Sequence, residues 1–160
     1  MPGALENILK FIHLLSAAVW IGMLIFFSFF AAPALFKALT REAAGESVGA
    51  IFPNYWRVGY AAGAVSLAAL LALSFITKAG PSVKIIILAV MLCTTLYSGL
   101  VVGARAKEVK AGIKAEADAS KKELLRGEFK RVHARSSILN IFVIVLGVVF
   151  IFLTAKGLVI

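Results

Sequence analysis

Four stretches of this 160-residue chain contain no Lys, Arg, Asp or Glu, and they limit its fold more than any other feature. The first has 26 residues and each of the others has 20; they run over residues 11–36, 58–77, 85–104 and 136–155. At about 1.5 Å per residue, a 20-residue helix spans the roughly 30 Å hydrocarbon core of a bilayer. The backbone finds no water there, so each span must be helical. The sequence therefore predicts an all-α fold, an integral membrane four-helix bundle.

The composition agrees with a membrane protein. Hydrophobic residues make up 61% of the chain and charged residues 16%, whereas about 25% of a soluble domain is charged. The single cysteine, Cys93, excludes an internal disulfide framework and a cysteine-clustered metal site. The first window is too long for the apolar part of a signal peptide, so we expect a retained membrane helix. We predict one membrane domain over 1–160, with spans at 8–33, 55–77, 84–104 and 136–156 and a helical hairpin at 105–135.

Basic residues are distributed unevenly along the chain. Four spans place both termini on one side of the membrane, and thirteen of the 17 Lys and Arg residues fall on the other side. The positive-inside rule therefore predicts a bacterial inner-membrane protein with both termini in the periplasm or exterior and the hairpin in the cytoplasm. The basic surplus also predicts contact with anionic lipids. Nucleic acid is not expected as a partner, because acidic residues are interleaved and no aromatic stacking platform accompanies the basic ones.

The connections between the spans carry their own signals. Residues 37–53 predict a short interfacial helix capped near Thr40, with the second span beginning at Phe52-Pro53. Gly80-Pro81-Ser82 predicts a tight turn between spans two and three. Ser120-Lys121-Lys122-Glu123 matches a capping box, which predicts a helix start there. Apolar residues at helical spacing favour a packed hairpin over a solvated linker; they are Val109, Ile113, Leu125, Phe129 and Val132.

Small residues recur at helical spacing in the second and third spans. Gly59 and Gly63 are four residues apart, and so are Gly99 and Gly103. Such stripes let helices approach closely, within one chain or between subunits. They favour a homo-oligomer or a membrane-protein partner.

A polar residue inside a bilayer is costly, so each one is a candidate site. His13 lies in the outer part of the first span, and Ala17, Trp20 and Leu24 follow it on one helical stripe. One interpretation is a ligand of haem b or of a metal, with Trp20 as a cofactor-binding residue. The other is a histidine that hydrogen-bonds a neighbouring helix beside a packed tryptophan. His133 lies about 30 Å away along the bundle axis, so the two histidines cannot ligate one haem within one protomer.

A second group of polar residues gathers at the predicted cytoplasmic ends of spans two, three and four. The predicted binding residues are Asn54, Arg57, Tyr97, Arg105, His133 and Asn140. His133 and Asn140 are seven apart and share a helix face. Asn140 is the deepest of the group, and we expect it to hydrogen-bond across helices. The group is either a binding site for an anionic moiety or a set of interface anchors and headgroup contacts.

Three segments resemble a known family. They read IHLLSAAVWIGMLIFFSFFAAPALF (12–36), AGESVGAIFPNYW (44–56) and HARSSILN (133–140). They resemble bacterial relatives of the human transmembrane protein two-hundred-and-five, which implies a four-helix membrane protein of undefined activity. The human relative's link to platinum-drug resistance implies transport or trafficking. His13, Trp20 and Gly22 are also similar to the first helix of copper-resistance membrane proteins and of membrane-bound protoporphyrinogen oxidase, which implies a haem ligand at His13.

Three functions remain open on the sequence. No carboxylate lies in a charge-free window, which argues against a proton-coupled pump. Phosphate-binding glycine loops, nucleophile elbows and paired-His zinc motifs are missing, which argues against an enzyme. We expect a non-enzymatic structural or accessory component of a membrane complex. The alternatives are a b-type haem or metal protein using His13 in electron transfer, and a small transporter or resistance factor for a metal or an amphipathic compound.

Overall fold

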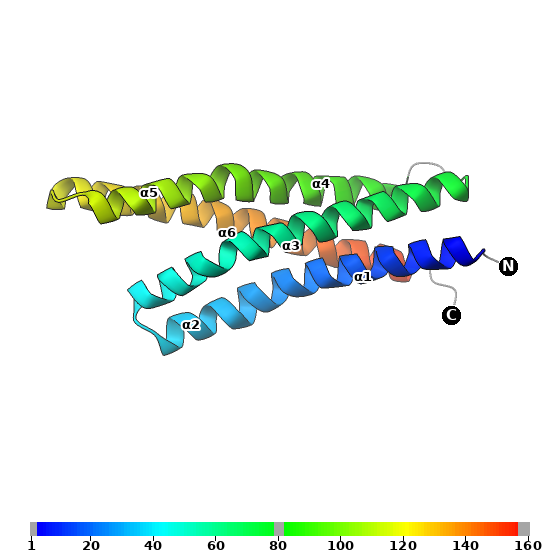
Figure 1. Cartoon of the computed structure of the whole chain (residues 1–160), viewed down its shortest axis with the longest axis horizontal. Helices are drawn as coiled ribbons and strands as arrows, with labels where there is room; N and C mark the ends of the chain where they lie inside the picture. Colours follow the sequence, from blue (N-terminus) through cyan, green and yellow to red (C-terminus); the bar gives the residue numbers. More distant parts are fainter. Residues whose placement is uncertain (1–2, 79–81, 157–160) are drawn as a thin grey trace.

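The computed structural model describes residues 3–78 and 82–156, and four long helices lie along one another in this part of the chain (Figure 1). Their elements, in which η marks a π-helical turn, are α1 (Ala4–Phe26), η1 (Phe27–Ala31), α2 (Ala32–Ala38), α3 (Arg41–Ile76), α4 (Val83–Tyr97), η2 (Ser98–Gly103), α5 (Ala104–Ala115) and α6 (Ala119–Ala155). Membrane helix 1 is α1–η1–α2, helix 2 is α3, helix 3 is α4–η2–α5, and helix 4 is α6. Each is long and apolar enough to cross a bilayer. The predicted all-α membrane bundle is therefore confirmed.

The four helices pack in a closed ring. α1 lies against α3, α3 against α4, α4 against α6, and α6 against α1. The start of α1 and the end of α6 lie at the same end of the bundle (Figure 1). At the other end, α5 and the first half of α6 extend as the predicted hairpin, in which Val109 is buried. α2 and the start of α3 diverge from this hairpin.

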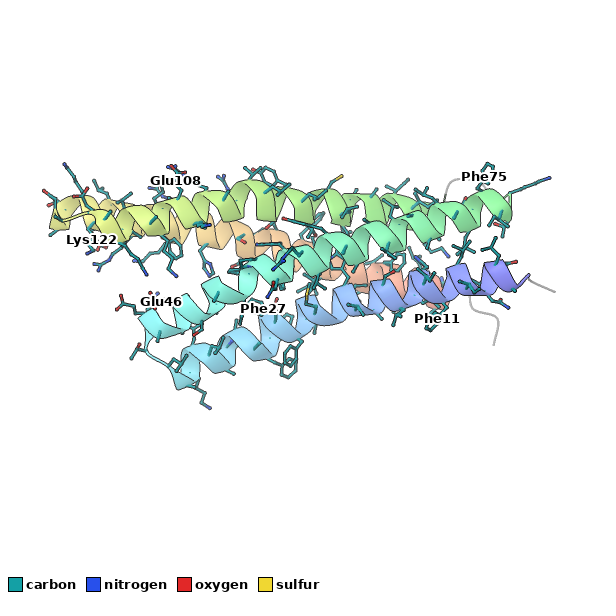
Figure 2. All side chains as sticks on the ribbon, in the orientation of Figure 1. Phe11, Phe27, Glu46, Phe75, Glu108 and Lys122 are labelled. Atoms are coloured by element: carbon teal, nitrogen blue, oxygen red, sulfur yellow. The ribbon has the colours of Figure 1, made fainter. Side chains whose placement is uncertain are left out.

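Much of the apolar side-chain surface points outward. Phe11 and Phe75 are 64% and 87% exposed and project away from the bundle (Figure 2). In each helix, the most apolar 18-residue window has at most 33% of its residues buried inside the structure. A surface of this kind and extent is stable only against an apolar medium. The chain is therefore a multi-pass membrane protein whose helices contact lipid.

The start of membrane helix 2 differs from the prediction. Thr40 caps a helix as expected, accepting a hydrogen bond from the Ala43 amide, but that helix is α3 itself, with Pro53 inside it. The prediction of a separate interfacial helix, and of a helix that begins at Phe52-Pro53, was therefore wrong. Proline removes one helical hydrogen bond, yet α5 fastens the turns before it: Lys110 Nζ donates to the Gly45 carbonyl at 3.0 Å, and Lys114 Nζ bonds Glu46 at 2.7 Å.

The hairpin turn also needs one correction. The N-cap of α6 is Asp118, two residues before the predicted cap Ser120, so α6 begins at Ala119. The Asp118 carboxylate accepts hydrogen bonds from the amides of Ser120 and Lys121 at 2.8 and 3.0 Å. A carboxylate at a helix N-terminus gains from the helix dipole as well as from these bonds. The predicted turn at Gly80-Pro81-Ser82 lies outside the described residues except for Ser82, which caps α4.

Aromatic rings of the same chain fill the glycine stripes. Trp20 is fully buried, and its indole lies over Gly63, where an added Cβ would come within 2.9 Å of Trp20 Cη2. Tyr60 and Trp56 occupy the corresponding space at Gly99. The glycines therefore leave room for an aromatic ring of the facing helix: a ring of α1 packs against α3, and rings of α3 pack against η2. The stripes offer no free surface of small residues for another subunit.

We expect Gly63→Ala to destabilise the protein by about 1–3 kcal/mol, because Trp20 and Leu92 enclose the position and cannot move without disturbing the core. Gly45→Ala, on the same helix and with nothing within 4 Å of an added Cβ, is the matched control. It should be neutral or slightly stabilising, since alanine favours a helix. Thermal unfolding of both variants in one detergent measures the difference. Equal midpoints would contradict this account of the core.

Candidate polar site and groove

The two π-helical turns lie around the same residue of membrane helix 4. Ser28 of η1 hydrogen-bonds Asn140, and Ser98 of η2 lines a small cavity together with Asn140. π turns are rare, and they occur frequently at functional sites because the extra residue re-aims the side chains around it. The coincidence of two such turns at one polar residue marks this level of the bundle as the candidate site.

Asn140 joins three membrane helices through direct hydrogen bonds. The Tyr55 hydroxyl of α3 donates to Asn140 Oδ1 at 2.7 Å. Asn140 Nδ2 donates to Ser28 Oγ at 2.7 Å, and the Ser28 hydroxyl donates to the Leu24 carbonyl, also at 2.7 Å. This bears out the expectation that Asn140 bonds across helices. Such bonds hold helices in register inside a bilayer, where an unpaired amide is costly.

A groove of about 340 Å³ opens beside this network, where α2 and the start of α3 diverge from the hairpin. Its polar lining consists of Ser28, Tyr55, His133, Ser136, Ser137 and Asn140. Its walls are aromatic: Phe27 packs on Tyr55 with ring centroids 5.0 Å apart, and Phe52 stacks on Trp56 at 5.9 Å. Sites for small molecules commonly have about 300–1,000 Å³, apolar walls and a few polar groups. The groove has all three properties.

His133 and Asn140 are the predicted binding residues that meet in this groove. His133 is exposed at its mouth and stacks on Phe129, whereas Asn140 lies at its floor. Ser28 and Tyr55 complete the floor and were not predicted. The only sequence signal for Ser28 was a hydroxyl placed among phenylalanines in the first charge-free window. Tyr55 gave no such signal, because it lies just before the second window.

The other predicted binding residues lie elsewhere. Arg57 donates to Asn54 and to the Pro53 carbonyl on its own helix. Arg105 bonds Glu108 on α5 and Glu128 on α6, which ties the two arms of the hairpin together. Tyr97 is exposed and is not among the residues that line the groove. These residues serve helix and hairpin contacts, and they do not form one anion site with Asn140.

His13 is packed and hydrogen-bonded inside the opposite end of the bundle. It is 4% exposed, and Nδ1 lies 2.9 Å from the Ser66 carbonyl oxygen and 3.1 Å from Ser66 Oγ. The Phe150 ring approaches its edge with centroids 5.5 Å apart. Neither cavity borders His13, and Trp20, which follows it on the same face of α1, fills core space. A haem needs an open face at its ligand, so this environment does not fit haem b at His13 within one protomer.

We expect disruption of the Asn140 network to cost stability in a coupled way. Tyr55→Phe and Asn140→Leu should each destabilise the protein by about 0.5–1.5 kcal/mol. The double variant should cost clearly less than the sum, because both single changes break the same bond. Tyr97→Phe is the control, since its hydroxyl makes no hydrogen bond among the described residues. Additive losses in thermal unfolding would contradict the network.

One family matches the chain over most of its length. The family model is described as a domain of unknown function, DUF4149, and it matches residues 15–115. The match therefore includes Ser28, Tyr55 and Ser98 and ends with the last residue of α5. No curated protein and no solved structure matches the chain.

Proposed function

Because the chain belongs to the DUF4149 family, whose function is unknown, we propose from its own geometry that it is a non-enzymatic membrane protein that binds an amphipathic molecule. The site is the groove at Asn140. The proposal depends on one observation above all: a space of about 340 Å³ with aromatic walls and a hydrogen-bonding floor, inside a membrane bundle. An apolar portion of a ligand would lie against the rings, and a polar group would reach the floor.

This proposal takes the third of the sequence-based functions, a transporter or resistance factor, and limits it to an amphipathic compound. A metal is less well supported, because the described residues hold no group of three or more His, Cys, Asp or Glu side chains. The accessory-subunit function loses one support, since rings of the same chain fill the glycine stripes. The resemblance to relatives of transmembrane protein two-hundred-and-five agrees with the proposal.

We further propose that the groove opens toward the cytoplasmic half of a bacterial inner membrane. Thirteen of the 17 basic residues lie on this side of the spans, in agreement with the positive-inside rule. The groove ends at Asn140, and Trp20, Leu24 and Val143 are buried between that floor and the outer end. This conformation therefore fits binding from one side or from the lipid, and not an open pore.

The proposal is tested by fluorescence, because one of the two tryptophans lines the groove and the other is in the core. Trp56 borders the groove, whereas Trp20 is fully buried. We expect 11-bromoundecanol, whose bromine quenches indoles on contact, to quench the wild-type protein in lipid nanodiscs in a saturable way. Unbrominated undecanol should compete. Trp56→Phe should remove the saturable component.

Two alanines of α2 provide matched variants for the same experiment. Ala32 lines the groove, whereas Ala34 is exposed and outside its lining. Ala32→Phe should weaken the saturable quenching at least tenfold by filling the groove, and Ala34→Phe should leave it unchanged. Quenching that rises linearly and equally in both variants reports only partition into lipid, and this result would overturn the proposed site.

A further inference from the structure

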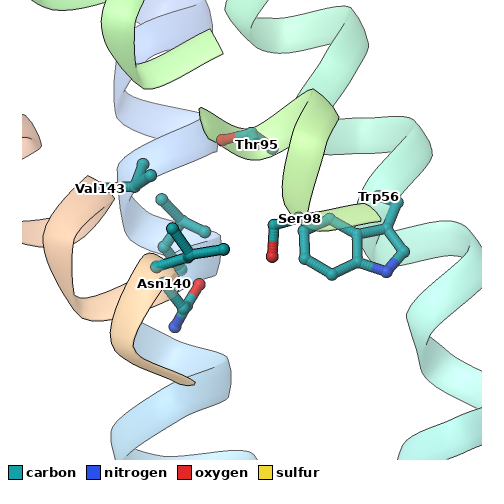
Figure 3. A pocket seen from close by; sticks show the side chains of 7 residues that line it. Trp56, Thr95, Ser98, Asn140 and Val143 are labelled. Carbon is teal, nitrogen blue, oxygen red and sulfur yellow. The ribbon is translucent and has the colours of Figure 1, made fainter. Parts of the chain in front are cut away.

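A second, smaller cavity lies beside Asn140, between η2 and α6. It measures about 10 Å³ and is lined by residues that include Trp56, Thr95, Ser98, Asn140 and Val143 (Figure 3). A space of about 10–15 Å³, measured with a water-sized sphere, holds one water molecule if two to four polar partners are present. The size therefore excludes any larger ligand, and the polar groups decide whether water binds.

Ser98 is the residue of this cavity whose buried hydroxyl lacks a hydrogen-bond partner. It is 2% exposed, and its Oγ makes no hydrogen bond. Among the described residues, only this atom and Trp20 Nε1 are buried side-chain polar atoms without a partner. A buried unpaired hydroxyl costs about 1–3 kcal/mol. In Figure 3 the Ser98 hydroxyl points into the space that the Asn140 carboxamide borders from the opposite side.

Ser98 also differs from seven other hydroxyls in and at the ends of these helices. A helical serine or threonine commonly donates to the carbonyl four residues earlier. That bond is made by Ser16, Ser28, Ser47, Thr77, Thr95, Ser137 and Thr154. Ser98, the first residue of η2, does not make it and instead directs its hydroxyl to the cavity. Its orientation is therefore not explained by its own helix.

We propose that one water molecule binds in this cavity and bridges Ser98 to Asn140. The Ser98 hydroxyl donates to the water. The water donates to Asn140 Oδ1, which has a second lone pair beside the one that Tyr55 uses, and to Thr95 Oγ1, whose own proton goes to the Met91 carbonyl. Three partners are typical of a buried water. Direct bonds connect helices 1, 2 and 4 at Asn140; the water adds helix 3.

The water site does not depend on a ligand in the groove. Whether Ser98→Ala raises or lowers the unfolding midpoint tests it. If Ser98 is unpaired, Ser98→Ala removes a penalty and leaves the unfolding midpoint unchanged or higher. If a water is bound, the same change removes one of its partners, and we expect the midpoint to fall by about 2–4 °C. Ser47→Ala is the control, since that hydroxyl bonds its own helix backbone, and it should change the midpoint by less than about 1 °C.

A double-mutant cycle tests whether the water reaches Asn140. In the Asn140→Leu background, Ser98→Ala should lower the midpoint by less than half of its effect in the wild type, because the bridge is already broken. A full, additive loss would overturn the bridge. An experimental map that resolves other buried waters should also show density about 2.6–3.2 Å from Ser98 Oγ. Empty density there, or a midpoint raised by Ser98→Ala, would overturn the water site.

Discussion

The structure depends on one constraint: inside hydrocarbon, each backbone N–H and C=O must be paired within the chain. This constraint makes each membrane helix long and nearly unbroken, and it leaves few places where the backbone can depart from α-helical geometry. The departures within the described helices are the turns η1 and η2, Pro33 just after η1, and Pro53 inside α3. A departure at membrane depth is tolerated only where side chains or water satisfy the backbone and its neighbours.

The departures gather around one polar residue, and this links the backbone constraint to the site. Ser28 of η1 accepts from Asn140, Tyr55 lies two residues after Pro53 and donates to Asn140, and Ser98 of η2 faces the Asn140 cavity. The divergence of α2 and the start of α3 from the hairpin begins beside these residues and produces the groove (Figure 1). The polar network therefore holds the bundle together at the level where its helices begin to separate.

The sequence was sufficient for the fold because charge is so costly in hydrocarbon that four charge-free windows admit few arrangements. It was insufficient for helix ends, because a charged residue marks the membrane surface and not the end of a helix. α3 continues past Arg57 and Pro53 for this reason. The sequence identified Asn140 because it lies deep in the fourth charge-free window. Ser28 and Tyr55 could be recognised as its partners only from the rotation of each helix, which the structure gives. Glycine spacing predicted close approach correctly, yet not that a ring of the same chain would fill the space.

The chemistry of the groove differs from that of the surface around it, and this difference bears on what the groove selects. The hairpin end carries most of the basic residues, and a positive field acts on anionic groups within a Debye length of about 8–10 Å. Within the described part of the chain, no lysine, arginine or carboxylate lines the groove, and His133 stands only at its mouth. A charged group that entered would lose hydration without gaining an ion pair. On the proposed function, the surface charge would concentrate anionic lipid nearby, while hydrogen bonding and ring contacts would decide which uncharged polar group reaches Asn140.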